Sequence, residues 1–205
     1  MNKLLIATKN PGKLFELKSF LSDIPHAGVS LSDLHITEDI EETAKTYKEN
    51  AEKKATFFAK ISGLPTIADD GGLEIEALGG APGVVSRRWF GYEASDDELI
   101  AHMEKLAREL PANNRKARFV TVVSFALPDG RVWSKEGTVD GIIAEKPYAR
   151  KLQGYPFRSF FYLPEVNKYY FETELTADEQ RKYNHRYKAI EKLKPMIRKV
   201  FRIKY

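Results

Sequence analysis

Two adjacent carboxylates, Asp69 and Asp70, are the residues of this chain best suited to carry chemistry. They follow a short apolar run at 66–68 and precede two glycines, after which apolar and polar residues alternate over 73–77. This pattern predicts a sharp turn between two extended segments. Neighbouring carboxylates repel each other unless a cation lies between them, and magnesium often takes one or two carboxylates beside substrate phosphates. A solvated turn without a function explains the same residues equally well.

A second group suited to ligand binding lies near the start of the chain, between an apolar run at 3–7 and apolar residues at helical spacing over 14–21. This order predicts a strand, a loop and a helix with a proline in its first turn. Hydroxyl, amide, ammonium and backbone N–H groups at a helix N-terminus suit an anion. Simple capping of the helix is the alternative. The residues of this loop are Thr8, Lys9, Asn10, Pro11, Gly12 and Lys13.

The remaining pattern indicates alternating helices and strands. A helix is expected over about 46–61, after an acidic stretch at 38–43. Asn50 and Lys54 are four residues apart on it and can reach one ligand, although a solvated lysine is the commoner case. A capping box predicts a further helix over 95–110, and a hairpin turn at 128–131 joins two predicted strands.

Composition limits the classes of function. The chain has 205 residues, 42% of them hydrophobic, which fits one large domain or two lobes sharing a core. The net charge of +4 suits a phosphate-bearing ligand, but no basic run typical of a nucleic-acid-binding arm is present. The absence of cysteine excludes disulfides and thiolate metal ligands. No signal peptide or membrane span is expected, so we expect a cytoplasmic protein that contacts neither membranes nor nucleic-acid polymers.

Taken in order, these motifs resemble the inosine/xanthosine triphosphate pyrophosphatase family. The resemblance covers nearly the whole chain and depends on the order and spacing of its motifs. These are Thr8-Lys9-Asn10-Pro11-Gly12-Lys13, Glu41-Glu42-Thr43, Glu49-Asn50-Ala51 with Lys54, Ala68-Asp69-Asp70-Gly71-Gly72-Leu73, Leu78-Gly79-Gly80-Ala81-Pro82-Gly83-Val84, Phe161-Tyr162-Leu163-Pro164-Glu165 and Asn184-His185-Arg186.

The resemblance implies a fold and a reaction. The fold would be α/β, with an elongated mixed central β-sheet, flanking helices and two lobes around a nucleotide cleft, all within a single domain over 1–205. The reaction would be hydrolysis of ITP, dITP or XTP to the nucleoside monophosphate and pyrophosphate. It would need Mg²⁺, for which Mn²⁺ could substitute, and the protein would be a homodimer. The aromatic segments at 89–90 and 169–171 could supply the dimer interface or lie in the core.

The resemblance also implies roles for individual residues. Asp70, as metal ligand or general base, and Lys54 would be catalytic. Glu41, Glu42, Asp69 and Asp70 would serve the metal. His185 and Arg186 would read the purine. The other substrate-binding residues would be Thr8, Lys9, Asn10, Pro11, Gly12, Lys13, Asn50, Gly71, Phe157, Arg158 and Asn184.

Four positions depart from the family pattern. Arg158 stands where the family has an acid, Asn184 replaces a serine, Gly71 replaces a serine or threonine, and Gln180 replaces a lysine. A guanidinium only donates hydrogen bonds, so Arg158 cannot read a base as a carboxylate does. It could stack on the base, donate to it, or turn outward and leave the base pocket to His185 and Arg186. The departures leave two alternatives open, namely the same chemistry on a different base, or a nucleotide-binding protein without catalysis.

Overall fold

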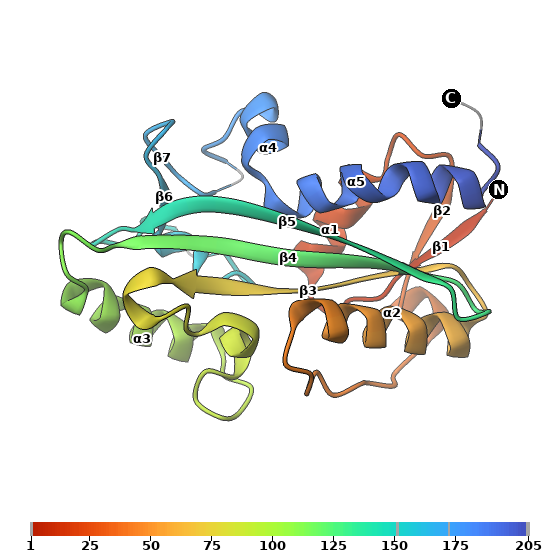
Figure 1. Ribbon diagram of the computed structural model, residues 1–205, viewed down its shortest axis with the longest axis horizontal. Helices are drawn as coiled ribbons and strands as arrows, with labels where there is room; N and C mark the ends of the chain where they lie inside the picture. Colours follow the sequence, from red (N-terminus) through yellow and green to blue (C-terminus); the bar gives the residue numbers. More distant parts are fainter. Residues whose placement is uncertain (1, 151, 172, 204–205) are drawn as a thin grey trace. The chain divides into compact units, whose positions relative to one another are not determined.

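The computed structural model, which describes residues 2–150, 152–171 and 173–203, has the predicted α/β fold (Figure 1). A mixed sheet has the strand order β2-β1-β3-β4-β5-β6-β7. The strands are β1 (Lys3–Ile6), β2 (Ala27–Ser30), β3 (Thr66–Ile75), β4 (Lys116–Ala126), β5 (Val132–Ile143), β6 (Phe161–Leu163) and β7 (Lys168–Tyr169). The α-helices are α1 (Pro11–Phe20), α2 (Tyr47–Ser62), α3 (Asp96–Glu109), α4 (Ala177–Tyr183) and α5 (His185–Val200).

The chain divides into two compact units. The first comprises Met1–Asp70, Thr121–Gly137 and His185–Tyr205, and the second comprises Gly71–Val120 and Thr138–Asn184. Among the described residues, no helix is both long and apolar enough to cross a membrane.

In the first unit, α-helices cover both faces of the sheet. β1 pairs in parallel with β2 and with β3. Buried residues of α1 and α5 pack against one face, and those of α2 pack against the other (Figure 1). Ile67 of β3 belongs to the core under α1 and α5, whereas the next residue, Ala68, belongs to the core under α2. Successive side chains of a strand point to opposite faces, so this part of β3 contributes alternately to two cores.

In the second unit, the core lies between the sheet and α3. It contains Leu73 and Ile75 of β3, Phe119 of β4, and Leu99 and Met103 of α3. β6 pairs antiparallel with both β5 and β7. The presence of parallel and antiparallel pairs makes the sheet mixed, as predicted.

The strand β3 is continuous, so the predicted turn at Asp69 and Asp70 is wrong. All five residues at 66–70 are buried. A run of carboxylates and glycines is typical of a turn, but here helices cover both faces of the strand and the carboxylates find partners within the fold. Tertiary packing therefore overrides the local preference.

The local signals for helix ends are confirmed. Pro11 begins α1, and the Asn10 side chain caps that helix. Thr46 caps the start of α2, which ends at Gly63 with φ = +67°, a conformation that favours glycine. The predicted capping box at Ser95 and Glu98 opens α3. These caps fix where α1 and α2 meet the sheet.

Candidate active site in the first unit

The alternation of β3 sends Asp69 and Asp70 to different helices. The Asp69 side chain points to the same face of β3 as that of Ile67, where it contacts side chains of α1 and α5. Asp70 has the orientation of Ala68 and meets a side chain of α2. The two carboxylates therefore have different hydrogen-bond donors, although the charges of Lys13 and Lys54 act on both.

Asp69 is buried, with 1% of its surface exposed, and lies among basic groups. Its Oδ2 accepts a hydrogen bond from Arg186 Nε at 3.0 Å and lies 3.0 Å from Arg186 Nη2 and 3.1 Å from Lys13 Nζ. Arg186 Nη1 also pairs with Glu16 of α1. The Oδ1 atom of Asp69 has no hydrogen-bond partner among the residues that the structure describes. Asp69 thus links both α1 and α5 to β3.

Asp70 is held from the α2 side. Its Oδ2 accepts a hydrogen bond from Asn50 Nδ2 at 2.9 Å, and Asn50 Oδ1 in turn accepts one from the Ala44 backbone N–H at 2.9 Å. The main-chain oxygen of Asp70 accepts a hydrogen bond from Thr121 Oγ1 at 3.1 Å. The contact to Ala44 fixes the amide so that its NH₂ group points to Asp70.

Lys54 lies one turn after Asn50 and reaches the same end of β3. Its Nζ donates to the main-chain oxygen of Asp69 at 3.1 Å and pairs with Glu42. Asn50 and Lys54 therefore lie on one face of α2, as predicted, and their contact with one ligand stays a prediction. Glu41 has an exposed side chain, and its main-chain oxygen accepts a hydrogen bond from Lys53 Nζ at 2.8 Å.

The opening loop makes the contacts of a helix cap. Thr8 Oγ1 accepts from the Asn10 N–H at 3.2 Å, and Asn10 Oδ1 accepts from the N–H groups of Gly12 and Lys13 at 2.9 and 3.1 Å. Lys9 points to the surface and pairs with Asp39 at 2.8 Å. Capping and anion binding are compatible, because the Thr8 hydroxyl keeps its own proton to donate. The Lys13 side chain remains 22% exposed and so can be reached by a ligand.

The two carboxylates differ in their proton affinity. Burial opposes ionisation of Asp69, but the charges of Lys13, Arg186 and Lys54 outweigh it and lower its pKa well below the ordinary value of 3.8. Burial raises the pKa of Asp70, although Lys13, Lys54 and the hydrogen bond from Asn50 oppose the shift. Burial and the nearby charge of Lys13 lower the pKa of Lys54. Asp70 therefore takes up a proton more readily than an ordinary aspartate, as a general base does.

The four predicted metal-binding carboxylates are not gathered into one cluster. Among the described residues, no group of three or more histidine, aspartate or glutamate side chains is placed to hold a metal ion. Glu42 and Asp70 both lie beside α2, through their contacts with Lys54 and Asn50. Asp69 is surrounded by cationic groups, which disfavours a further cation there. The oxygen donors of Glu42 and Asp70 suit Mg²⁺ or Mn²⁺ in the presence of substrate phosphates.

The predicted base-reading residues of the second unit are mostly buried. Arg158 is 3% exposed, so it does not point into solvent, and its position relative to a base stays a prediction. Its guanidinium carbon lies 3.9 Å from the ring centre of Tyr155 and 4.9 Å from that of Tyr170, within the range of cation–π contacts. Phe157 belongs to the core, and Asn184 is the C-cap residue of α4. Gly71 is the first residue of this unit and lies within β3.

Three residues near the site had no role in the sequence analysis. Glu16 is buried and pairs with Arg186, and Thr121 is buried and bonds to Asp70. Gly137 of β5 touches α5, since a Cβ atom there would lie 1.9 Å from the main-chain oxygen of His185. Of these three residues, only Glu16 could have been found from the sequence, because it is an acid three residues after Lys13 and so lies on the same helix face. His185 itself is 4% exposed and begins α5.

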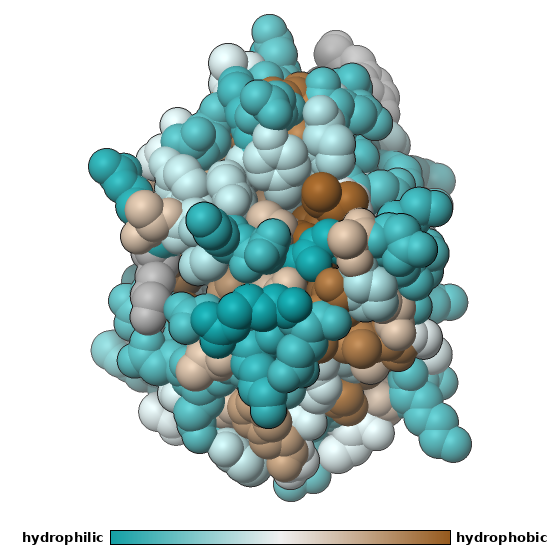
Figure 2. All heavy atoms as spheres, turned by 90° about the vertical axis from the view of Figure 1, so that its left-hand side faces the viewer, coloured by the Kyte–Doolittle hydropathy of each residue, from teal (hydrophilic) through white to brown (hydrophobic). Residues whose placement is uncertain are grey.

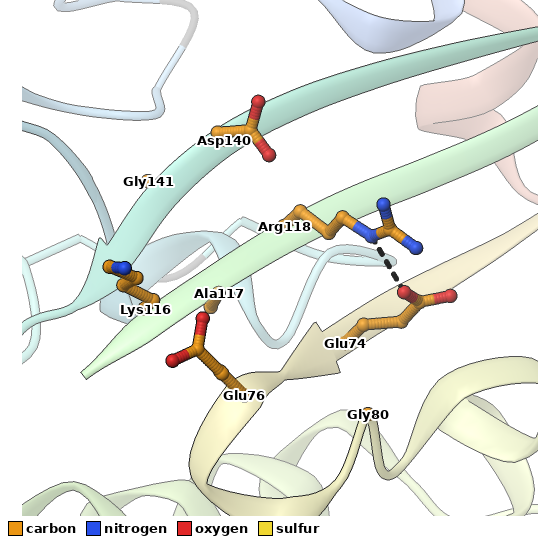
Figure 3. Close-up of a pocket in the computed structure, with 8 residues that line it drawn as sticks. All are labelled: Glu74, Glu76, Gly80, Lys116, Ala117, Arg118, Asp140 and Gly141. Atoms are coloured by element: carbon orange, nitrogen blue, oxygen red, sulfur yellow. Dashed lines mark hydrogen bonds and ion pairs between the residues drawn. The ribbon is translucent and has the colours of Figure 1, made fainter. Parts of the chain in front are cut away.

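A cavity of about 420 Å³ lies in the second unit but has the wrong lining for a triphosphate (Figure 3). Arg118 is held by Glu74, with Nε 2.7 Å from Oε2, and acidic side chains are prominent around the cavity. An excess of carboxylates repels phosphate. The lining residues are Glu74, Glu76, Gly80, Lys116, Ala117, Arg118, Asp140 and Gly141.

Known proteins are similar to this chain over nearly its whole length. The model of the Ham1 family matches residues 4–196. A Thermus thermophilus protein named dITP/XTP pyrophosphatase is 43% identical over 191 residues, which cover 93% of this chain and 89% of that protein. A Bacillus subtilis protein of the same name is 40% identical over 200 residues, covering 96% and 98%. The solved structure of a HAM1 protein from Coxiella burnetii has a TM-score of 0.80 and 32% identity, covering 97% of this chain and 100% of that one.

Proposed function

The chain belongs to the Ham1 family, and from this premise we propose that it hydrolyses non-standard purine nucleoside triphosphates to the monophosphate and pyrophosphate. The relatives from Thermus and Bacillus are named dITP/XTP pyrophosphatases, so the proposed substrates are dITP, XTP and the ribose form ITP. In this reaction water adds to the α-phosphorus, the α–β anhydride bond breaks, and pyrophosphate leaves.

The observation that carries the proposal is that the ammonium groups of Lys13 and Lys54 both contact Asp69, the residue directly before Asp70. Lys13 Nζ lies 3.1 Å from the Asp69 carboxylate, and Lys54 Nζ lies 3.1 Å from the Asp69 main-chain oxygen. Lys13 also belongs to the first turn of a helix, where the backbone is partially positive. Phosphoryl transfer depends mainly on positioning and on neutralisation of charge, which these groups supply to a triphosphate.

The metal is assigned to the α2 side of β3. Glu42 and Asp70 would hold Mg²⁺ or Mn²⁺ together with phosphate oxygens, and the exposed Glu41 is the neighbouring carboxylate that could assist. A bound metal supplies charge neutralisation and lowers the pKa of a coordinated water. Asp70, with its raised pKa, would orient the attacking water or take its proton. Lys54 would exchange its contact with Glu42 for one with a phosphate oxygen.

Within the first unit, base selection is assigned to His185. An imidazole N–H can donate to the oxygen that inosine and xanthosine carry at position six, whereas adenine has an amino donor there. For the second unit taken by itself, Phe157, Arg158 and Asn184 are proposed as base contacts, with Arg158 as a donor where the family has an acceptor. This difference favours a selectivity among oxo-purines that departs from the family pattern.

A homodimer located in the cytoplasm completes the proposal. In the second unit, Phe90 and Tyr92 are 37% and 53% exposed and could supply apolar interface area. Tyr170 and Phe171 are buried, so they belong to the core. On the face shown in Figure 2, hydrophilic residues surround a smaller hydrophobic area. Light scattering should give twice the chain mass of 23.4 kDa, and the mass of a single chain at micromolar concentration would contradict the dimer.

The test of the function is product release from a panel of triphosphates with Mg²⁺. ITP, dITP and XTP should give the highest kcat/KM, with equal amounts of monophosphate and pyrophosphate. Release of orthophosphate would contradict the reaction type. Binding of every triphosphate without turnover would favour the non-catalytic alternative. If a triphosphate with another base had the highest kcat/KM, the reaction type would stand and the proposed substrate would change.

A further inference from the structure

The Asn50 side chain contacts two parts of the first unit that carry proposed metal ligands. Its Oδ1 accepts a hydrogen bond from the Ala44 backbone N–H at 2.9 Å, and its Nδ2 donates one to Asp70 Oδ2 at 2.9 Å. Ala44 lies two residues after Glu42. Asn50 is 1% exposed, and a buried amide is costly unless its polar atoms are bonded. One buried amide therefore bonds both the segment that carries Glu42 and the carboxylate of Asp70.

The segment that carries Glu42 is irregular. It spans residues 36–46, all within the described range 2–150, and side chains of α2 hold it. These contacts are Lys53 Nζ with the Glu41 main-chain oxygen at 2.8 Å, Lys54 with Glu42, and Asn50 with the Ala44 N–H. A lysine head group moves on a flexible four-carbon stem, whereas the short asparagine side chain has two torsions. Asn50 thus restricts the position of this segment more narrowly than the two lysines do.

The proposed function makes the Asn50 contact more important when substrate binds. Lys54 would then leave Glu42 for a phosphate oxygen, and the segment would lose one of its contacts with α2. The bond between Asn50 and Ala44 involves no group assigned to the phosphates, so it can persist. On β3, Thr121 Oγ1 donates to the main-chain oxygen of Asp70 at 3.1 Å and holds its backbone. Asn50 adds the bond that orients the Asp70 carboxylate.

We propose that Asn50 is a positioning residue that holds the backbone beside Glu42 and the carboxylate of Asp70 in place for a divalent cation. This inference rests on the proposed function, because it takes Glu42 and Asp70 to be the ligands of Mg²⁺ or Mn²⁺. The role does not require the contact between Asn50 and the substrate that the sequence resemblance implies. Asn50 acts instead on the two carboxylates through its hydrogen bonds.

Mn²⁺ binding tests this role directly. Mn²⁺ should be titrated into protein saturated with a non-hydrolysable ITP analogue and followed by electron paramagnetic resonance. Asn50→Leu removes both hydrogen bonds and keeps a side chain of similar size. Its Mn²⁺ affinity should be at least about tenfold weaker than that of the wild type, the scale for losing a partner of a metal ligand. Unchanged Mn²⁺ affinity in Asn50→Leu would overturn the proposal.

Lys53→Gln is the matched control. It removes another contact between α2 and the same segment, made by an exposed lysine to the Glu41 main-chain oxygen. Because Asn50 remains, the Mn²⁺ affinity should stay within about twofold of the wild-type value, as for most surface substitutions. Loss of a positive charge does not by itself weaken cation binding, so a fall would report on the segment. Equal weakening in Lys53→Gln and Asn50→Leu would overturn the specific role of Asn50.

The anion side of β3 separates positioning from a general loss of structure. Binding of inorganic tripolyphosphate without a metal, measured by calorimetry, depends on Lys13 of α1 and should stay close to the wild-type value in Asn50→Leu. A fall equal to that of the Mn²⁺ affinity would indicate a general structural effect and would overturn the proposal. Thermal melting checks each variant, and Asn50→Ala, which leaves space for water beside Asp70, replaces Asn50→Leu if that variant does not fold.

The wild type separates a failure of this inference from a failure of the proposed function. Wild-type protein that binds no Mn²⁺ in the presence of the analogue would overturn the metal assignment of the proposed function, and this inference with it. Wild-type Mn²⁺ binding that is retained in full by Asn50→Leu would overturn the role of Asn50 alone and leave the metal assignment in place.

Discussion

Asp69 and Asp70 are consecutive residues of β3, yet their carboxylates accept hydrogen bonds from helices on opposite faces of the sheet in the first unit. Asp69 contacts Lys13 of α1 and Arg186 of α5. Asp70 contacts Asn50 of α2. The first carboxylate is held ionised by cations, whereas burial raises the pKa of the second. Asp69 therefore lies among basic residues, and action on water or a metal stays a prediction for Asp70.

The first prediction is that Asp70→Asn abolishes turnover and leaves nucleotide binding largely intact. Asparagine keeps the shape and the hydrogen bond with Asn50 but cannot take a proton or neutralise a metal ion. Loss of such a group costs about a hundredfold or more in rate. Pyrophosphate release measures the rate, and calorimetry with an inosine triphosphate analogue measures the binding. Wild-type turnover in Asp70→Asn would remove Asp70 from the catalytic assignment.

A second prediction concerns stability, on which the two aspartates should have opposite effects. A lowered folded-state pKa stabilises the protein at pH values above the ordinary 3.8, and this stabilisation is lost as pH falls further. Asp69→Asn should therefore lower the free energy of unfolding at pH 7, by about 3–5 kcal/mol for a broken buried ion pair. The difference in the free energy of unfolding between Asp69→Asn and the wild type should be smaller by about 1 kcal/mol at pH 3.

For Asp70 the expected change in the free energy of unfolding has the opposite sign. A raised folded-state pKa means that the ionised carboxylate costs stability at neutral pH, and this cost disappears below pH 3.8, where both states are protonated. Asp70→Asn should thus stabilise the protein at pH 7 by about 0.5–2 kcal/mol, the range of stabilising substitutions at functional sites. Urea unfolding at pH 7 and pH 3 tests both variants. Equal destabilisation by the two substitutions would contradict the opposite pKa shifts of these carboxylates.

The third prediction is that activity depends on a divalent cation held on the α2 side. Excess chelator should abolish pyrophosphate release, and Mg²⁺ or Mn²⁺ should restore it. Mn²⁺ binding with a nucleotide analogue, followed by electron paramagnetic resonance, should weaken at least about tenfold in Glu42→Gln. Glu41→Gln is the matched control and should have a smaller effect, because that side chain is exposed. Full activity in excess chelator would contradict a metal-dependent mechanism.

The sequence predicted the elements near the site better than the contacts among them. Helix caps, the hairpin and the common helix face of Asn50 and Lys54 follow from short-range rules, and the structure has each of them. The continuity of β3 could not be predicted, because burial by helices on both faces is a tertiary property. The pair of Arg186 and Asp69 joins residues 117 positions apart, and residue spacing alone carries no information about such a contact.

The last prediction concerns Arg158 in the second unit, whose guanidinium lies against the rings of Tyr155 and Tyr170. Contact with both rings restricts where the guanidinium can lie. A guanidinium donor can read a carbonyl oxygen or N7 of a purine, whereas a carboxylate at this position would accept from ring N–H groups. Arg158→Asp should therefore shift the relative kcat/KM among bases by about tenfold or more.

Inosine, xanthosine, guanosine, adenosine and pyrimidine triphosphates should be compared for the wild type and Arg158→Asp. Arg158→Lys is the matched control, since it keeps a positive donor between the two rings and should shift selectivity less. Because a carboxylate against aromatic faces is unfavourable, the melting temperature of Arg158→Asp must be measured alongside the rates. A uniform fall in kcat/KM with an unchanged order of bases would show that Arg158 supports the core and does not face the base.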